Sequence, residues 1–174
     1  MIVLYIILGV MAIPFIIALF VSTDVSYKKS VTINATPDKI WANTNSLAAM
    51  DKWSPWLDKD PTMPRTFTGE DGKPGASHAW KSTIKQVGEG SQTIVKLTAP
   101  TRIDTRLDFI KPFKSTAAAF VTLEEEGGKT VATWGFESKM PYPMNIMKLF
   151  MNMKDGMDKE FGFGLNRLKE LSEN

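Results

Sequence analysis

The first 21 residues, from Met1 to Val21, form an apolar run without a charged side chain. As an α-helix this run would be roughly 30 Å long, which matches the hydrocarbon core of a bilayer. A cleaved secretory signal is the alternative interpretation, but no Lys or Arg precedes the run and no clear small-residue cleavage site follows it. The pattern therefore predicts a single transmembrane anchor over residues 1–22, followed by a soluble domain over residues 23–174.

The soluble part begins with strand periodicity and continues with a helix signal. Residues 25–34 alternate toward their end, which places Val31 and Ile33 on one face of a strand. Thr36 and Pro37 are typical of an N-cap and a first helical position. The pattern predicts a helix over 37–49, followed by a short loop or helical turn that carries two tryptophans.

From residue 63 apolar and polar residues alternate with a period of two, in short segments that turn residues separate. The clearest alternation runs from Arg102 to Phe109, where charged and apolar side chains take turns. Such a strand lies in an antiparallel sheet with one solvated face. The pattern predicts a meander of six strands over residues 65–69, 77–83, 91–98, 102–110, 116–124 and 130–137.

The last segment has helical spacing. Apolar side chains recur every three, four or seven residues from Met147 to Leu171, which predicts a long amphipathic helix. Gly156, Gly162 and Gly164 lie within it; they allow either a close approach of the helix to the sheet or a break near Gly156. The predicted fold is α+β, with a curved antiparallel sheet wrapped around the long C-terminal helix.

Composition narrows the function classes. The 174 residues carry a net charge of +2, and the 21 basic residues form no concentrated cluster along the chain, so no nucleic-acid partner is expected. Cysteine is absent, which excludes disulfides, thiolate metal sites and a cysteine nucleophile.

Lys28 and Lys29 follow the apolar run, and the positive-inside tendency then favours a cytoplasmic domain. These lysines also begin a predicted strand, so they have a structural interpretation too.

Three segments resemble a known superfamily: VTINATPDKIWANTNSLAAMDKWSPW, KPFKSTAAAFVTLEEEGGKTVATWGFE and MPYPMNIMKLFMNMKDGMDKEFGFGLNRLKEL. They are similar to the opening strand and helix, the late hairpin and the closing helix of the SRPBCC superfamily, the START-like, helix-grip group. The resemblance covers nearly all of residues 26–174. It implies the helix-grip fold but leaves function open, because the superfamily includes lipid carriers, polyketide cyclases, ring-oxygenase domains and chaperone activators. No segment matches a metal-binding or iron–sulfur module, which disfavours the oxygenases.

Large apolar side chains are the candidate ligand contacts. The five tryptophans and a cluster of methionines suit a cavity for an apolar molecule, although core packing explains the same residues. His78, the single histidine, is the one candidate general base with a near-neutral pKa, but a structural role is the simpler interpretation. The predicted ligand-binding residues are Trp53, Trp56, His78, Trp80, Phe109, Trp134, Phe136, Met147, Met151 and Phe161.

These observations favour binding over catalysis. The sequence predicts a membrane-anchored protein that holds a small hydrophobic ligand, such as a lipid, a quinone or a polyketide-like compound, in an internal cavity. Two alternatives remain: an enzyme of the cyclase or dehydratase type that uses His78, and a module that binds another protein. No Gly-rich phosphate loop or metal-ligand cluster is present in the sequence, so neither a cofactor nor a metal is expected.

Overall fold

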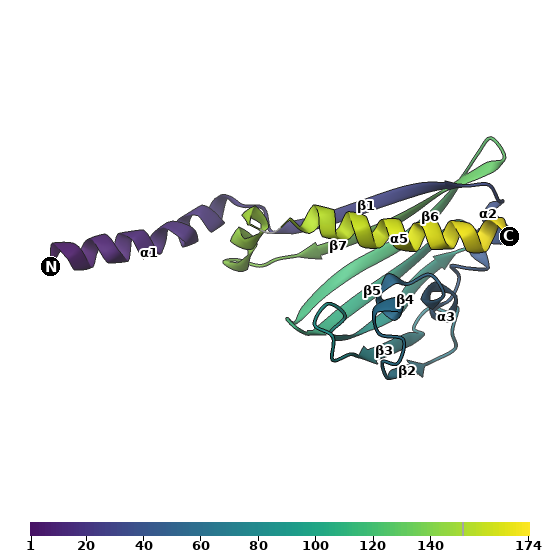
Figure 1. Ribbon diagram of the computed structural model, residues 1–174, viewed down its shortest axis with the longest axis horizontal. Helices are drawn as coiled ribbons and strands as arrows, with labels where there is room; N and C mark the ends of the chain where they lie inside the picture. Colours follow the sequence, from purple (N-terminus) through teal and green to yellow (C-terminus); the bar gives the residue numbers. More distant parts are fainter. Residues whose placement is uncertain (151) are drawn as a thin grey trace.

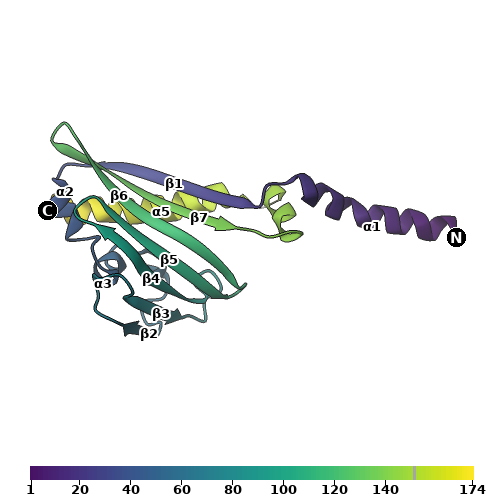
Figure 2. The ribbon, with the colours of Figure 1, turned by 180° about the vertical axis from the view of Figure 1, so that it is seen from behind.

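The computed structural model describes residues 1–150 and 152–174 of the chain. In these residues seven strands form one antiparallel sheet, and a long C-terminal helix lies across one of its faces (Figures 1 and 2). The strands are β1 (Asp24–Ile33), β2 (Arg65–Thr68), β3 (Ser77–Lys81), β4 (Glu89–Thr98), β5 (Arg102–Lys111), β6 (Ser115–Glu126) and β7 (Lys129–Lys139). The helices are α1 (Ile2–Phe20), α2 (Pro37–Trp41), α3 (Leu47–Asp51), α4 (Pro55–Lys59), the 3₁₀ helix η1 (Met144–Leu149) and α5 (Met153–Glu173).

The sheet order is β1-β7-β6-β5-β4-β3-β2. Strands β2 to β7 are consecutive neighbours, as in the predicted meander, and β1 joins the sheet by pairing with β7. The predicted α+β fold, a curved antiparallel sheet around a long C-terminal helix, is confirmed. We call the sheet face that α5 covers the inner face, and the opposite face the outer face.

Alternation along each strand decides which side chains reach the inner face. In β5, Ile103 and Thr105 point to the inner face and are buried, whereas Arg106, the residue after Thr105, points the other way and is exposed on the outer face. Three side chains of α5, Phe161, Leu165 and Leu168, are almost completely buried against the inner face. The hydrophobic core therefore lies between the sheet and the second half of α5.

The predicted helix over 37–49 is wrong, because the chain forms two short helices there, α2 and α3. Between them the hydroxyl of Thr44 donates to the carbonyl of Ile40 (3.4 Å), and the hydroxyl of Ser46 accepts from the backbone N–H of Ala49 (3.1 Å). Such short polar side chains compete for backbone hydrogen bonds and favour helix ends over helix interiors. The run of polar residues after Trp41 therefore separates the two short helices.

The C-terminal helix begins later than predicted, at Met153, and it is unbroken at Gly156. The preceding residues form η1, so Met147 lies in a 3₁₀ helix and not on the long helix. The side-chain amide of Asn145 donates to the carbonyls of Ala18 and Val21 (both 2.7 Å). These bonds hold η1 against the end of α1, which explains why this segment does not continue as part of α5.

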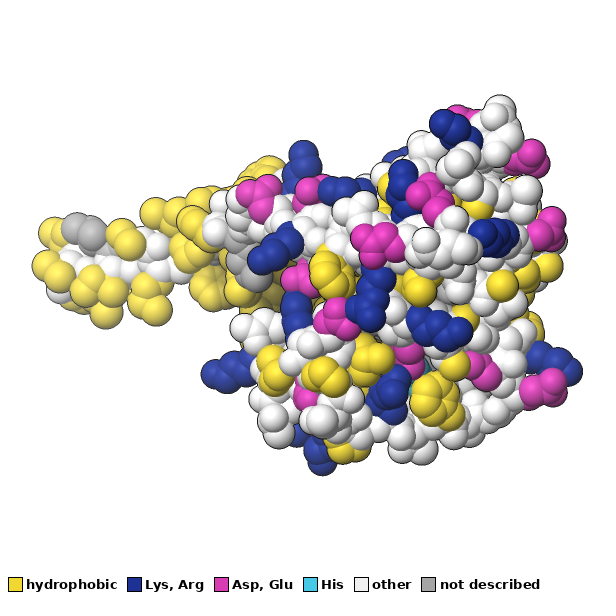
Figure 3. Space-filling view, turned by 45° about the vertical axis from the view of Figure 1, so that its right-hand side comes forward, with side chains coloured by type: hydrophobic (Ala, Val, Ile, Leu, Met, Phe, Trp, Pro, Cys, Tyr) yellow, Lys and Arg dark blue, Asp and Glu magenta, His cyan; other side chains and the backbone are white. Residues whose placement is uncertain are grey.

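Helix α1 projects away from the domain as an isolated rod (Figure 1). In the part of the chain that the structure describes, it is the one helix long and apolar enough to cross a membrane. Its side chains are exposed over almost the whole length, and Figure 3 shows hydrophobic side chains along the projecting helix. Ala18, which η1 covers, is buried.

Candidate functional site

Four aromatic side chains fill the inner space beneath the second half of α5. The ring of Trp134 on β7 stacks on Phe161 of α5, with 4.1 Å between the centroids. Trp53 and Trp56 meet the same indole edge-on, at centroid distances of 4.9 and 5.6 Å. Trp53 is also fixed by a hydrogen bond from its Nε1 to the carbonyl of Asn43 (2.9 Å). Trp134 is therefore the centre of a packed aromatic cluster.

A glycine allows this cluster to reach the helix. A Cβ atom added at Gly164 would lie 2.8 Å from the ring of Trp134 and 3.2 Å from the carbonyl oxygen of Trp53. Any larger residue would push α5 away from the two indoles. Gly156, one of the other glycines in α5, has nothing within 4 Å of the same position. Close approach thus explains Gly164 and does not explain Gly156.

The inner face is more open toward the opposite end of the sheet. Leu107 and Phe109 on β5 and Phe136 on β7 point to the inner face but remain half-buried. Trp80 on β3 is half-buried as well, and its ring meets Phe109 edge-on at 6.1 Å. These side chains leave apolar surface that an apolar ligand could cover.

A group of polar side chains lies at the β2–β3–β4 edge of the inner face. The imidazole of His78 is 7% exposed, and its Nδ1 lies 3.8 Å from a carboxylate oxygen of Asp51. Arg65 forms an ion pair with the same carboxylate. The amide of Gln92, which pairs with His78 across the strands, donates to the hydroxyl of Thr105 (3.0 Å).

Within the described residues the Nδ1 of His78 has no hydrogen-bond partner. A buried, unsatisfied nitrogen costs free energy unless it meets a partner, so a small shift that brings the Asp51 carboxylate or a polar group of a ligand within reach of it is favourable. Burial lowers the pKa of His78, and this effect outweighs the attraction of the Asp51 carboxylate. Burial likewise raises the pKa of Asp51, although His78 and Arg65 oppose the shift. At neutral pH the imidazole is therefore neutral and can accept or donate one hydrogen bond.

A second polar group joins β1 to the first half of α5. The hydroxyl of Tyr27 and the ammonium of Lys29 both donate to one carboxylate oxygen of Asp158 (2.7 Å each). Burial, together with the hydrogen bond to Asp158, raises the pKa of Tyr27 to about 12. The hydrogen bond from Lys29, followed by that from Tyr27, lowers the pKa of Asp158. Lys29 therefore has a structural role in attaching α5 to the edge strand.

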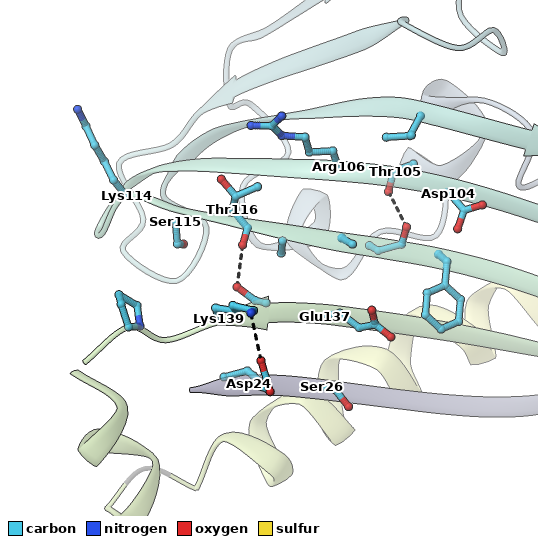
Figure 4. A pocket seen from close by; sticks show the side chains of 18 of the residues that line it. Asp24, Ser26, Asp104, Thr105, Arg106, Lys114, Ser115, Thr116, Glu137 and Lys139 are labelled. Carbon is cyan, nitrogen blue, oxygen red and sulfur yellow. Dashed lines mark hydrogen bonds and ion pairs between the residues drawn. The ribbon is translucent and has the colours of Figure 1, made fainter. Parts of the chain in front are cut away.

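A broad hollow of about 1140 Å³ lies on the outer face of the sheet, over β5, β6 and β7 (Figure 4). Asp104, Arg106 and Glu137 project into it, and an ion pair between Lys139 and Asp24 (3.8 Å) closes one end. Apolar atoms make up most of the lining of this hollow, but charged side chains of both signs stand among them, so an apolar molecule bound there would lie against Asp104, Arg106 and Glu137. The inner face suits such a ligand better.

The structure brings most of the sequence-predicted ligand contacts to the inner face, but in two groups. One group is the packed cluster around Trp134; the other surrounds the open end and the β3 edge. Met147 lies apart from both in η1, and Met151 lies outside the described residues. The packed group comprises Trp53, Trp56, Trp134 and Phe161, and the open group comprises His78, Trp80, Phe109 and Phe136.

Three residues of the site were not predicted from the sequence. Asp51 and Arg65 complete the polar group around His78, and Phe67 contacts its ring edge-on at 5.4 Å. Alternation in the segment 65–68 indicates that Arg65 and Phe67 share a face, but not that this face meets His78. Phe67 meets His78 because β2 and β3 pair in the folded protein, and the local sequence does not specify this pairing.

Among residues 1–150 and 152–174, no group of three or more His, Asp or Glu side chains is arranged to hold a metal ion.

Comparison with known proteins bears on the fold and the family. The solved structure of Ara h 8.0201 is 15% identical over 87% of this chain and 99% of that chain, with a TM-score of 0.58. Mll3558 from Rhizobium loti and a protein from Nitrosospira multiformis each share 15% identity over 85% of this chain and 96% of theirs, with TM-scores of 0.61.

Identities this low establish the fold alone. No curated protein is similar enough in sequence to count as a match. The model of one family, described as polyketide cyclase / dehydrase and lipid transport, matches residues 24–173, which is nearly the whole domain. The chain therefore belongs to the polyketide cyclase / dehydrase and lipid transport family, within the SRPBCC superfamily.

Proposed function

We propose that this protein is held in a membrane by α1 and binds a small hydrophobic ligand between the inner sheet face and α5. The observation that carries the proposal is the apolar, half-buried inner surface formed by Leu107, Phe109 and Phe136. The family description, which includes lipid transport, supports the same class of ligand. A lipid, an isoprenoid quinone or a polyketide-like compound has the required chemistry.

Binding would be driven by desolvation of apolar surface, at about 25 cal/mol per Å² buried. The aromatic cluster around Trp134 provides a rigid floor for the ligand, because its rings are already packed against one another. The free Nδ1 of His78 would accept or donate one hydrogen bond to a polar group of the ligand and so fix its orientation. Specificity would come from this contact and affinity from the apolar walls.

The anchor fits this function, because a ligand that partitions into lipid is most concentrated at the membrane. The length and composition of α1 support a single span. We place the domain on the cytoplasmic side, following the positive charges after the span. The support for this orientation comes mainly from the exposed Lys28, since the ammonium of Lys29 forms an ion pair with Asp158.

Native mass spectrometry of the full chain, extracted in mild detergent, tests the proposal. Phe109 and Ile110 are neighbours on β5, but Phe109 faces inward and Ile110 is exposed on the outer face. The wild-type protein and an Ile110→Glu control should carry an apolar compound, whereas Phe109→Glu should lose it while its circular dichroism spectrum stays native. A wild-type protein that carries nothing, and takes up none of the lipids and quinones offered, would contradict the proposal.

One observation favours a second candidate, an enzyme of the cyclase or dehydratase type. A buried neutral imidazole beside the Asp51 carboxylate is a suitable general base. Such an enzyme would convert a β-hydroxycarbonyl or poly-β-ketone compound, and His78→Gln would abolish turnover while leaving ligand binding nearly intact. If the bound compound is recovered chemically unchanged, the binding function stands and the catalytic one fails.

A further inference from the structure

Exposed apolar side chains gather on η1 and on Phe150 directly after it, where the domain joins α1. Leu149 is 58% exposed and Phe150 is 82% exposed, and Met144 is exposed at the start of the same segment. Single exposed apolar residues are common on protein surfaces, but several that lie close together mark a site of interaction. These side chains therefore point to something that covers them in the native setting.

The position of η1 relative to α1 is fixed by hydrogen bonds. Asn145 donates to two carbonyls in and after the last turn of α1, and the ammonium of Lys148 donates to the carbonyls of Ser22 (2.9 Å) and Asp24 (2.6 Å). The bonds from Asn145 satisfy carbonyls at the end of α1. The bonds from Lys148 attach η1 to the segment between α1 and β1. If α1 spans a bilayer, η1 lies at the level of its surface.

A second apolar tip points in the same direction. The hairpin between β5 and β6 carries Phe113, which is 68% exposed. Both ribbon views show this hairpin directed toward the α1 end of the molecule, whereas the β6–β7 hairpin points away (Figures 1 and 2). Ala117 and Asp24 lie one register step apart, through Ser138 and Lys139 of β7. Phe113 precedes Ala117 by four residues, so the hairpin lies at the same end of the sheet as the junction between α1 and β1.

Basic side chains accompany both tips. Lys111 and Lys114 flank Phe113, and Lys111 also pairs with Glu89 (3.0 Å). Lys148 precedes Leu149 and Phe150, but its ammonium is engaged by the carbonyls of Ser22 and Asp24. Aromatic and apolar residues with flanking lysines are typical of segments that lie in the headgroup region, where the rings enter the acyl boundary and the ammonium groups meet lipid phosphates. A protein partner would not require both tips to lie level with the end of a membrane span.

We propose that Phe113, with Lys111 and Lys114, and the exposed side chains of η1 form a docking face that inserts into the surface of the bilayer that α1 spans. This inference rests on the proposed membrane anchor and adds two contacts to it. Phe109 lies on β5 close to the same hairpin, so the docking face directs the open end of the inner surface toward the lipid. A hydrophobic ligand could then pass between bilayer and protein without crossing water.

The absence of cysteine in the chain makes a site-specific test direct. Four single-cysteine variants of the full chain, labelled with an environment-sensitive fluorophore, are reconstituted in phosphatidylcholine–phosphatidylglycerol nanodiscs. Phe113→Cys and Phe150→Cys report on the docking face, Ile13→Cys reports on the anchor, and Glu126→Cys on the β6–β7 hairpin is the control that points away. Quenching by lipids with a spin label near the headgroup is then compared, and circular dichroism verifies each fold.

We expect severalfold stronger quenching at positions 113 and 150 than at 126, together with blue-shifted emission. Strong quenching at position 13 by lipids labelled deep in the acyl chain would show the anchor independently. If position 13 is quenched while 113 and 150 behave like 126, the docking face is refuted and the anchor stands; a protein partner would then be the better occupant of these tips. If position 13 is not quenched either, both the anchor and the docking face fail.

Discussion

Replacing Gly164 by alanine tests the packing of α5 on the aromatic cluster. The new methyl group would meet the Trp134 ring at 2.8 Å and the Trp53 carbonyl at 3.2 Å, which is well inside normal contact. Neither neighbour can yield easily, because Trp134 is stacked on Phe161 and the other group is backbone. The helix must therefore shift, or the indoles must repack.

Two effects of opposite sign determine how much Gly164→Ala changes the free energy of unfolding. Alanine stabilises a helix interior by about 0.5–1 kcal/mol relative to glycine, and overpacking a filled site costs about 1–3 kcal/mol. Gly156 provides the matched control, because the same substitution there meets nothing within 4 Å. The propensity gain largely cancels when the two variants are compared, so their difference measures the packing cost. We expect Gly164→Ala to be about 1–3 kcal/mol less stable than Gly156→Ala.

The assay is urea unfolding of the full chain in mild detergent, followed by tryptophan fluorescence. Three of the five tryptophans, Trp53, Trp56 and Trp134, belong to the cluster, so the signal reports on its packing. Gly156→Ala should shift the midpoint upward slightly, and Gly164→Ala should shift it downward or leave it unchanged. A Gly164→Ala protein as stable as the Gly156→Ala protein would refute the close packing described for α5.

Three further predictions concern separate parts of the molecule. The single imidazole signal in NMR should titrate below pH 6.5. As the pH falls from about 7.5 to 5.5, the free energy of unfolding should fall too, because the unfolded chain takes up a proton that folded His78 does not. His78→Gln should lack this fall, and an imidazole that titrates at 6.5 or above would contradict the burial of His78. Gly135→Ala should cost about 1–3 kcal/mol, because its methyl group would overlap the Phe120 ring; Phe120→Leu in the same chain should recover most of the loss in thermal unfolding, and no recovery would point to another cause. Asn145→Ala should speed amide exchange severalfold at the end of α1, where it removes two carbonyl partners; unchanged exchange in nanodiscs would show that the cap is dispensable.

Strand positions were predictable because the alternation is local. In β5, charged residues face solvent and apolar residues face the core, and the sequence from Arg102 to Phe109 already displays this. Helix ends were less predictable. Thr44 and Ser46 end α2 and begin α3 through their hydroxyl groups, and Asn145 holds η1 on a helix more than a hundred residues away. Neither effect is visible in hydrophobic periodicity.

The candidate site was predictable as a set of side chains but not as an arrangement. Tryptophan-rich strands and loops indicated an aromatic inner surface, yet the sequence does not tell whether Trp53 and Trp134 line a space or fill one. The structure packs them at 4.9 Å and leaves the opposite end of the inner face half-buried. The ion pair of Asp51 with Arg65 joins a helix to an edge strand, and such tertiary contacts have no local signal.

The central claim is that a hydrophobic ligand lies on the inner face. Photocrosslinking tests it most directly: the full chain in nanodiscs is irradiated with a diazirine-bearing fatty acid and, separately, a diazirine-bearing quinone, and the adducts are mapped by mass spectrometry. We predict adducts at Leu107, Phe109 and Phe136, reduced by an excess of unlabelled ligand. Adducts confined to α1, or to the outer hollow around Phe120, would contradict the claim.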